Sequence, residues 1–291
     1  MKTLALAALG MLSFAGAAQA LEVRFYPADH IYAYELDPLH HARSLNLQNV
    51  AIINDGTAPV TLNEVDIQLM SGGHVLDTRI FGPEELTRAA GNGVGLQQQN
   101  LLGLLAFQFG GEALTPAGTR YSPDLTLDPG EAIMINSQVF AYRGERDALR
   151  VRVNGDQAEG RIAIRTGVSQ TAFSFPLRGA WYNANGSTFH TGHRWSPMEE
   201  FASDLLKLGS DFRSHRGDGT RFTDYYAYGE PVFAAADGRV VSVVTDQVED
   251  VTAMQRPGET ADAYMARLMQ DQFRRVAGGA PGIAGNQIMI D

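Results

Sequence analysis

Residues 225–243 read YYAYGEPVFAAADGRVVSV, and this stretch decides the fold that we expect for the C-terminal part of the chain. Residues 229–231 are a turn signal, and the apolar run that follows them predicts a short strand over residues 232–234. Asp237 and Gly238 form a tight-turn dipeptide, which is typical of a hairpin. The β-branched run at residues 240–244 is therefore expected to return antiparallel to the first strand.

Three further motifs accompany this hairpin. Gly192-His193-Arg194 and the apolar run FASDL at 201–205, which contains Asp204, lie before it, and GNQIMID at 285–291 follows it. The order of a histidine, an aspartate in an apolar run, GEPVxAxxDGxV and GNxIxID resembles the lysostaphin/LytM-like zinc metallopeptidases. The resemblance covers about residues 180–291. It implies a β domain of the duplicated-hybrid-motif type and hydrolysis of peptide cross-links in peptidoglycan.

A catalytic zinc ion takes three protein ligands and keeps one position open for water or substrate. The chain has no cysteine, so any zinc site must use histidine and carboxylate ligands. The resemblance implies that His193 is the first ligand and Asp204 the second. His190, three residues before His193, and His215, in the polar stretch 211–224, remain alternative ligands.

The surroundings of Asp204 bear on this assignment. Phe201 and Leu205 flank it, and a carboxylate in so apolar a run is not expected to be buried without a partner, which is either a metal or a nearby arginine. The interval from His193 to Asp204 is longer than in the simplest members of the family. It resembles a variant with a loop inserted at residues 194–200.

In the family, GNxIxID is followed by a His-Gly segment, a Tyr-Ala-His strand and a His-x-His pair. These supply the third zinc ligand and the catalytic histidines, and none of them occurs up to Asp291. We therefore expect the chain to be part of a longer protein and to be inactive by itself, so its catalytic residues stay unknown. The alternative is a non-catalytic LytM-like protein that binds the wall or regulates another hydrolase. A sugar phosphotransferase of related fold fits an exported chain poorly, because its phosphoryl donor is cytoplasmic.

Residues 1–20 predict a secretory signal peptide: Lys2 precedes an apolar run that ends in Ala18-Gln19-Ala20, a small-x-small cleavage site. The protein is therefore expected to be exported, either to the periplasm or out of a bacterial cell. No other segment is long and apolar enough to span a membrane. The net charge of −10 argues against a nucleic-acid partner, which would require clustered Lys and Arg. The oligomeric state is not indicated.

Residues 21–178 alternate between apolar and polar positions and contain frequent turn signals, a pattern typical of an immunoglobulin-like β-sandwich. One helix or two short ones are expected as an insertion at residues 84–109, with a flexible break at 91–95. His30, His40, His41 and His74 are expected to be surface or hydrogen-bonded side chains. The expected strands are 21–26, 45–53, 60–69, 74–81, 132–140, 149–153, 161–166 and 171–177.

Residues 179–291 are expected to form the N-terminal part of the LytM-like domain. Residues 179–187 are polar and rich in turn formers, which indicates a linker packed against one domain. Residues 261–276 carry one apolar helical face, with Thr260 as the N-cap and Gly278-Gly279 after the end.

Overall fold

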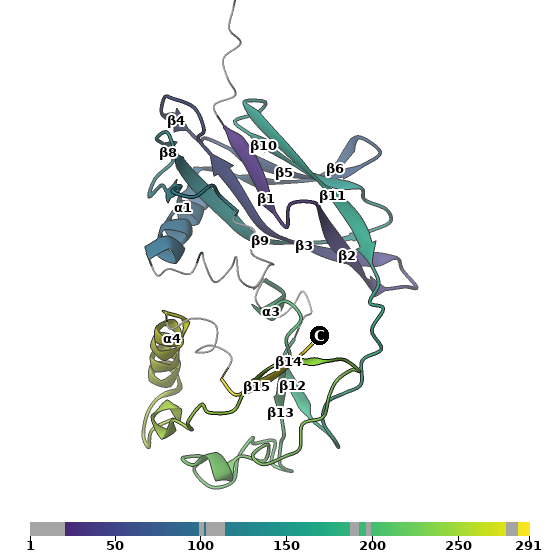
Figure 1. The fold of residues 1–291 in the computed structure, drawn as a ribbon, viewed down its shortest axis with the longest axis vertical. Helices are drawn as coiled ribbons and strands as arrows, with labels where there is room; N and C mark the ends of the chain where they lie inside the picture. The colour runs from purple at the N-terminus through teal and green to yellow at the C-terminus, as the bar shows by residue number, and fades with distance from the viewer. Residues whose placement is uncertain (1–20, 99–101, 103–113, 187–191, 196–198, 278–284) are drawn as a thin grey trace, which may run out of the picture.

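The computed structural model describes residues 21–98, 102, 114–186, 192–195, 199–277 and 285–291. The expected signal peptide, His190 and the Gly278-Gly279 stop signal lie outside these residues. The fold is mostly β, as predicted. Figure 1 shows a large sheet formed by the N-terminal strands, with the C-terminal elements gathered on one side of it.

The N-terminal part is one curled, mixed sheet of nine strands. Eight of them run in the order β6-β5-β10-β11-β2-β3-β9-β7, and β1 pairs with β3 outside this order. The β11–β2 and β7–β9 pairs are parallel, and the other pairs are antiparallel. The strands are β1 (Glu22–Tyr26), β2 (His30–Asp37), β3 (Ala42–Ile53), β5 (Val65–Ser71), β6 (His74–Phe81), β7 (Arg120–Tyr121), β9 (Glu131–Arg143), β10 (Ala148–Val153) and β11 (Ala158–Gly167), and β4 (Val60–Thr61) pairs separately with β8 (Thr126–Leu127).

The central strand β3 is buried on both of its faces. Leu45 and Leu47 lie in the hydrophobic core of the sheet. Successive side chains of a strand point to opposite faces, so Ser44, Asn46 and Gln48 lie on the other face. Ser44 and Asn46 are nevertheless almost fully buried. A polar row inside a well-packed sheet needs partners, and these come from the segment around residue 194.

Helix α1 (Pro83–Gln98) replaces the broken helix that we expected, because it runs through residues 91–95 without interruption. Gly93 lies in its middle and faces the ring of Tyr121 on β7. A Cβ atom at Gly93 would stand 2.8 Å from Tyr121 Cδ1, so glycine here permits close packing of helix against strand. Residues 99–101 and 103–109 of the expected insertion lie outside the described residues.

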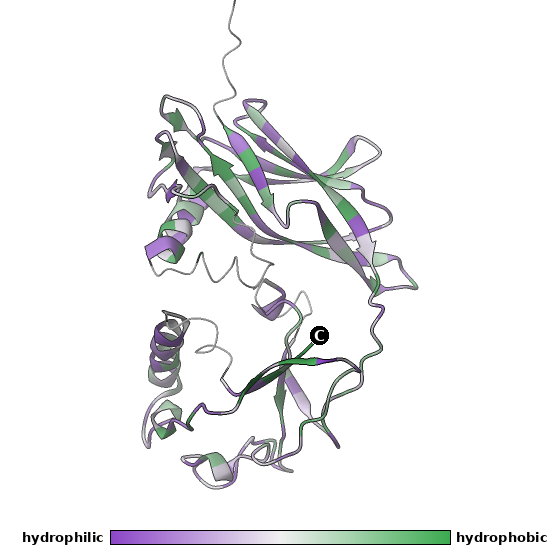
Figure 2. Cartoon of the chain, viewed as in Figure 1, coloured by the Kyte–Doolittle hydropathy of each residue, from purple (hydrophilic) through white to green (hydrophobic). Residues whose placement is uncertain are grey.

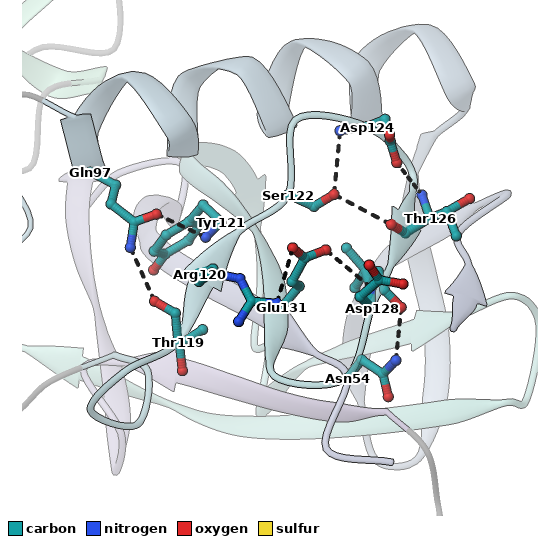
Figure 3. A network of polar contacts seen from close by, with 11 residues as sticks. Asn54, Gln97, Thr119, Arg120, Tyr121, Ser122, Asp124, Thr126, Asp128 and Glu131 are labelled. Carbon is teal, nitrogen blue, oxygen red and sulfur yellow. Dashed lines mark hydrogen bonds and ion pairs between the residues drawn. The ribbon is translucent and has the colours of Figure 1, made fainter. Parts of the chain in front are cut away.

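A polar network joins the end of α1 to the sheet edge (Figure 3). Gln97 Oε1 accepts a bond from the Tyr121 backbone N–H at 3.0 Å, and its Nε2 donates to the carbonyl of Thr119 at 3.0 Å. Arg120 pairs with Glu131 at 3.4 Å, and Asn54 Nδ2 donates to the Leu127 carbonyl at 2.8 Å. Gln97 of α1 thereby satisfies one backbone N–H of the short edge strand β7 and the carbonyl just before it.

The sheet region differs from prediction in several places, and the short strands β7 and β8 are among the elements that were not expected. Strand β2 was not predicted, and residues 60–69 form two strands, β4 and β5, interrupted at residues 62–64. Residues 171–177 are not a strand, although Ser174 N–H donates to the Ala235 carbonyl at 2.7 Å and Phe233 N–H to the Pro176 carbonyl at 2.8 Å. The run 171–177 therefore hydrogen-bonds with the C-terminal region rather than with the large sheet.

The same two bonds correct the hairpin prediction. Residues 232–234 are not a strand and do not pair with β14 (Val240–Val244). Instead, β14 pairs antiparallel with β15 (Gln287–Ile290), and Arg239 and Asp291 exchange two backbone bonds of 2.9 Å beyond it. Gly238 allows this approach, since a Cβ there would lie 2.5 Å from Ile290 Cγ2.

The remaining C-terminal elements are short. The expected linker 179–187 contains a strand, β12. The helix predicted at 261–276 is confirmed as α4. Thr260 caps it, because its Oγ1 accepts a hydrogen bond from the Ala263 N–H at 3.3 Å. These elements are β12 (Tyr182–Asn185), α3 (Gly192–Trp195), β13 (Asp204–Leu206), the 3-10 turns η1 (Phe222–Asp224) and η2 (Val251–Ala253), and α4 (Ala261–Ala277).

The β14–β15 pair is strongly apolar, as Figure 2 shows. Its valines and isoleucines remain largely exposed, among them Val240, Val243 and Ile288. The buried hydrophobic side chains of the described residues lie almost entirely in the N-terminal sheet. No helix among the described residues is long and apolar enough to cross a membrane.

Candidate functional site

The two residues that the resemblance indicates as zinc ligands lie side by side. His193 is on the short helix α3, and Asp204 opens β13, which is held by antiparallel pairing with β12. His193 Nε2 stands 3.4 Å from Asp204 Oδ2. The histidine is 7% exposed, whereas the Asp204 side chain is 57% exposed. Asp204 is thus largely exposed although its neighbours in the sequence are apolar, because its strand is short and lies at the surface.

A backbone contact fixes the orientation of the His193 ring. His193 Nδ1 lies 3.1 Å from the carbonyl oxygen of Ala202. A carbonyl can only accept, so Nδ1 carries a proton, and in the neutral ring the lone pair is on Nε2. That lone pair faces the Asp204 carboxylate. Two acceptors that face each other are stabilised by a proton or a cation between them, and water can also reach the exposed carboxylate.

The separation of the two atoms fits a zinc ion. Histidine nitrogen and carboxylate oxygen each bind tetrahedral zinc at about 2.0–2.1 Å, which places two such ligands about 3.4 Å apart. Metal-bound histidines generally donate their other ring N–H to a carbonyl or carboxylate, as Nδ1 does here to Ala202. His193 and Asp204 therefore fit as two ligands of one zinc ion. Within the described ranges, no group of three or more His, Asp or Glu residues is placed to hold a metal.

The segment that carries His193 is anchored to the large sheet by an ion pair that the sequence did not reveal. Arg194 and Glu200 form a salt bridge in which both side chains are almost fully buried. Arg194 Nη2 donates to Ser44 Oγ at 3.1 Å, and Gln48 Nε2 donates to Glu200 Oε2 at 3.1 Å. Asn46 Nδ2 donates to the carbonyl of Arg194 at 3.1 Å. The polar face of β3 thus holds both ends of the loop 194–200.

Burial changes the acid–base behaviour of this anchor. It lowers the pKa of the Arg194 guanidinium, because a charge is less stable away from water. Burial likewise raises the pKa of the neighbouring Tyr34 phenol, and the positive charge of Arg194 opposes that rise. Arginine nevertheless stays protonated in proteins, so the bridge is charged over the physiological range.

The other histidines of the described residues do not join this pair. His215 lies in the polar loop, as predicted, where it forms a β-bridge with Tyr225 and packs against that ring. His40 Nδ1 binds Asp37 Oδ2 at 2.6 Å, and His74 is exposed, as expected. His30 departs from the expectation, since its Nδ1 is buried without a hydrogen-bond partner in the described part of the chain.

Comparison of the chain with models of protein families, with curated proteins and with solved structures found no match.

Proposed function

We propose that the protein is an exported zinc metalloendopeptidase of the LytM-like type, which hydrolyses peptide cross-links in peptidoglycan. The proposal includes an immunoglobulin-like domain at residues 21–178 and a domain of duplicated-hybrid-motif type from residue 179. The observation that carries it is the 3.4 Å separation between His193 Nε2 and Asp204 Oδ2. Both residues were singled out by motif alone, ten residues of chain lie between them, and they meet at a spacing that zinc ligands adopt.

Each residue has a definite role in this proposal. His193 provides Nε2 as a ligand, and the Ala202 carbonyl holds the ring in the tautomer that this requires. Asp204 provides a carboxylate that faces solvent, on the side where water and substrate can reach the site. A zinc ion bound there would supply Lewis acidity that lowers the pKa of a bound water. The third ligand and the general base are not among the residues that we assign.

Zinc binding is the direct test. We would titrate the full chain with zinc against a chromogenic chelator, and repeat the titration with His193→Ala and Asp204→Ala. Each substitution should remove tight binding, because one ligand then remains of the assigned pair. His215→Ala is the matched control and should bind as the unaltered chain does. An equal loss of zinc affinity in His215→Ala, or an unchanged zinc affinity in His193→Ala, would contradict the assignment.

The second candidate is a non-catalytic LytM-like protein that binds the wall or regulates another hydrolase. It shares the resemblance and the wall with the first candidate and differs from it in carrying out no hydrolysis. Release of new amino groups from purified peptidoglycan separates the two candidates. Release that His193→Ala abolishes supports the peptidase. Sedimentation with peptidoglycan without such release, in a chain that includes any residues encoded after Asp291, supports the binding protein.

A further inference from the structure

A pocket of about 540 Å³ opens beside the segment that carries the candidate metal ligands. Its walls come from the turn before β2, from β2 and β3, and from Glu200 and Phe201. Phe201 directly precedes Ala202, whose carbonyl holds the His193 ring. A pocket of this volume is in the range that accommodates small organic ligands. The pocket therefore lies one residue away from the group that orients the metal ligand.

Aromatic side chains form a continuous row along one wall. His30, Tyr32 and Tyr34 alternate with the buried residues Ile31 and Ala33, so the three rings share the outer face of β2. The centroids of His30 and Tyr32 are 4.7 Å apart, and those of Tyr32 and Tyr34 are 6.5 Å apart.

Phe201 continues this row from the segment 199–202. Its centroid is 5.2 Å from that of Tyr34. The row of rings thus leads along β2 toward the segment of His193.

Neutral hydrogen-bonding groups line the rest of the pocket. Asn46 is 3% exposed and keeps its Oδ1 without a partner among the described residues, as does His30 for its Nδ1. A buried polar atom without a partner is destabilising, so a ligand that hydrogen-bonds there gains affinity. Gln48 and the phenols of Tyr32 and Tyr34 add groups that both donate and accept.

The charges of the lining exclude anionic ligands and disfavour cationic ones. None of the described lining residues is a lysine or an arginine. Glu200 is already neutralised by Arg194 and bound by Gln48, so it is a poor counter-ion for an ammonium group. Asp29 is the other acid, and it lies at the exposed rim.

We infer that this pocket binds a neutral pyranose of a glycan chain. The C–H faces of a sugar ring pack on the aromatic row, and its hydroxyls pair with Asn46, Gln48 and the tyrosine phenols. That the glycan belongs to the bacterial wall rests on the proposed function, whereas the preference for a sugar rests on the pocket itself. If both the proposed function and the sugar preference hold, the glycan strand lies along β2 and directs its peptide branches to His193 and Asp204.

The test uses isothermal titration calorimetry of the full chain with the β-1,4-linked tetramer of N-acetylglucosamine, a probe that carries no peptide. Tyr32→Ala should weaken binding by about tenfold or more, the loss expected for one packed aromatic contact. Tyr228→Ala is the matched control, because Tyr32 is 46% exposed, Tyr228 is 48% exposed, and Tyr228 is not part of the pocket. Phe201→Ala, with Phe212→Ala as its control, repeats the comparison on the other wall.

Binding that Tyr32→Ala weakens and Tyr228→Ala preserves supports the inference. Absence of binding at millimolar tetramer, or binding insensitive to both Tyr32→Ala and Phe201→Ala, overturns it. Tighter binding of butylammonium than of the tetramer also overturns it, in favour of a cation site. His193→Ala should bind the tetramer normally. If the tetramer binds while zinc does not, the pocket stands and the peptidase proposal fails.

Discussion

Replacing Glu200 with leucine tests whether the sheet holds the metal-ligand segment in place. The substitution removes the carboxylate that neutralises Arg194 and leaves the guanidinium buried, with its bond to Ser44 Oγ as a remaining contact in the described part of the chain. It also removes the acceptor of Gln48. We expect the loop 194–200 to leave β3, so that Arg194 can reach water and His193 loses its fixed orientation.

The size of the effect follows from burial. Leaving one partner of a buried ion pair without the other costs about 3–5 kcal/mol. Replacing both partners with apolar side chains avoids the isolated charge, so Arg194→Met with Glu200→Leu should cost about 1–3 kcal/mol, mainly for the unpartnered Ser44 hydroxyl. An exposed pair is worth little: Glu84→Gln, which removes one of the two acidic partners of Arg88 on α1, should cost about 0.5 kcal/mol or less.

Amide hydrogen exchange of peptides spanning residues 192–206 measures the local opening free energy directly. The same variants are titrated with zinc, and Glu200→Leu should lower zinc affinity about 10- to 100-fold, as loss of a residue that orients a ligand does. The double variant should recover most of the protection. Protection unchanged in Glu200→Leu, or a double variant as unprotected as the single one, would refute the view that the buried pair anchors the site.

Two further predictions concern regions away from the site. Gly93→Ala should destabilise the chain by about 1–3 kcal/mol in urea denaturation, because the new methyl group meets Tyr121, whereas Gly91→Ala, with open space around it, should stabilise by about 0.5–1 kcal/mol. The opposite ranking would contradict the close packing of α1. Hydrogen bonds from Arg267 lower the pKa of Glu259 to about 2 from 4.5. The stability from this pair is therefore complete above about pH 4.5 and is lost as the pH falls toward 2, and Glu259→Gln should remove that dependence from an acid titration of hydrogen exchange near α4.

The sequence predicted correctly those elements that are determined by residues close to one another in the chain. The strand at residues 74–81 and the helix α4, with its Thr260 cap, occur where the periodicity and the capping residue place them. The hairpin prediction failed because the turn residues Asp237 and Gly238 do not determine which strand pairs with β14. Its partner, β15, lies more than forty residues away in the chain, and such pairing leaves no local trace.

The site shows the same division. Motif order brought out His193 and Asp204, and the structure places them together. The anchor was missed, because Arg194 and Glu200 read as charges of a surface loop and their partners on β3 lie about 150 residues earlier. The polar alternation of Ser44, Asn46 and Gln48 was visible in the sequence. Such alternation usually marks the solvent face of a strand, so it does not by itself indicate buried polar partners.

The polar face of β3 gives the two proposals a common physical basis. The Nδ2 of Asn46 donates to the backbone of the metal-ligand segment, its Oδ1 has no partner among the described residues, and the side chain also lines the pocket. Gln48 likewise binds Glu200 and lines the pocket. A ligand that engages these amides therefore contacts the same side chains that hold the loop 194–200. A glycan that binds only when the loop 194–200 lies on β3 stabilises that arrangement. Glycan binding should therefore hold the loop, and with it His193, more firmly in place. By linkage, zinc bound at His193 should tighten the glycan to the same degree.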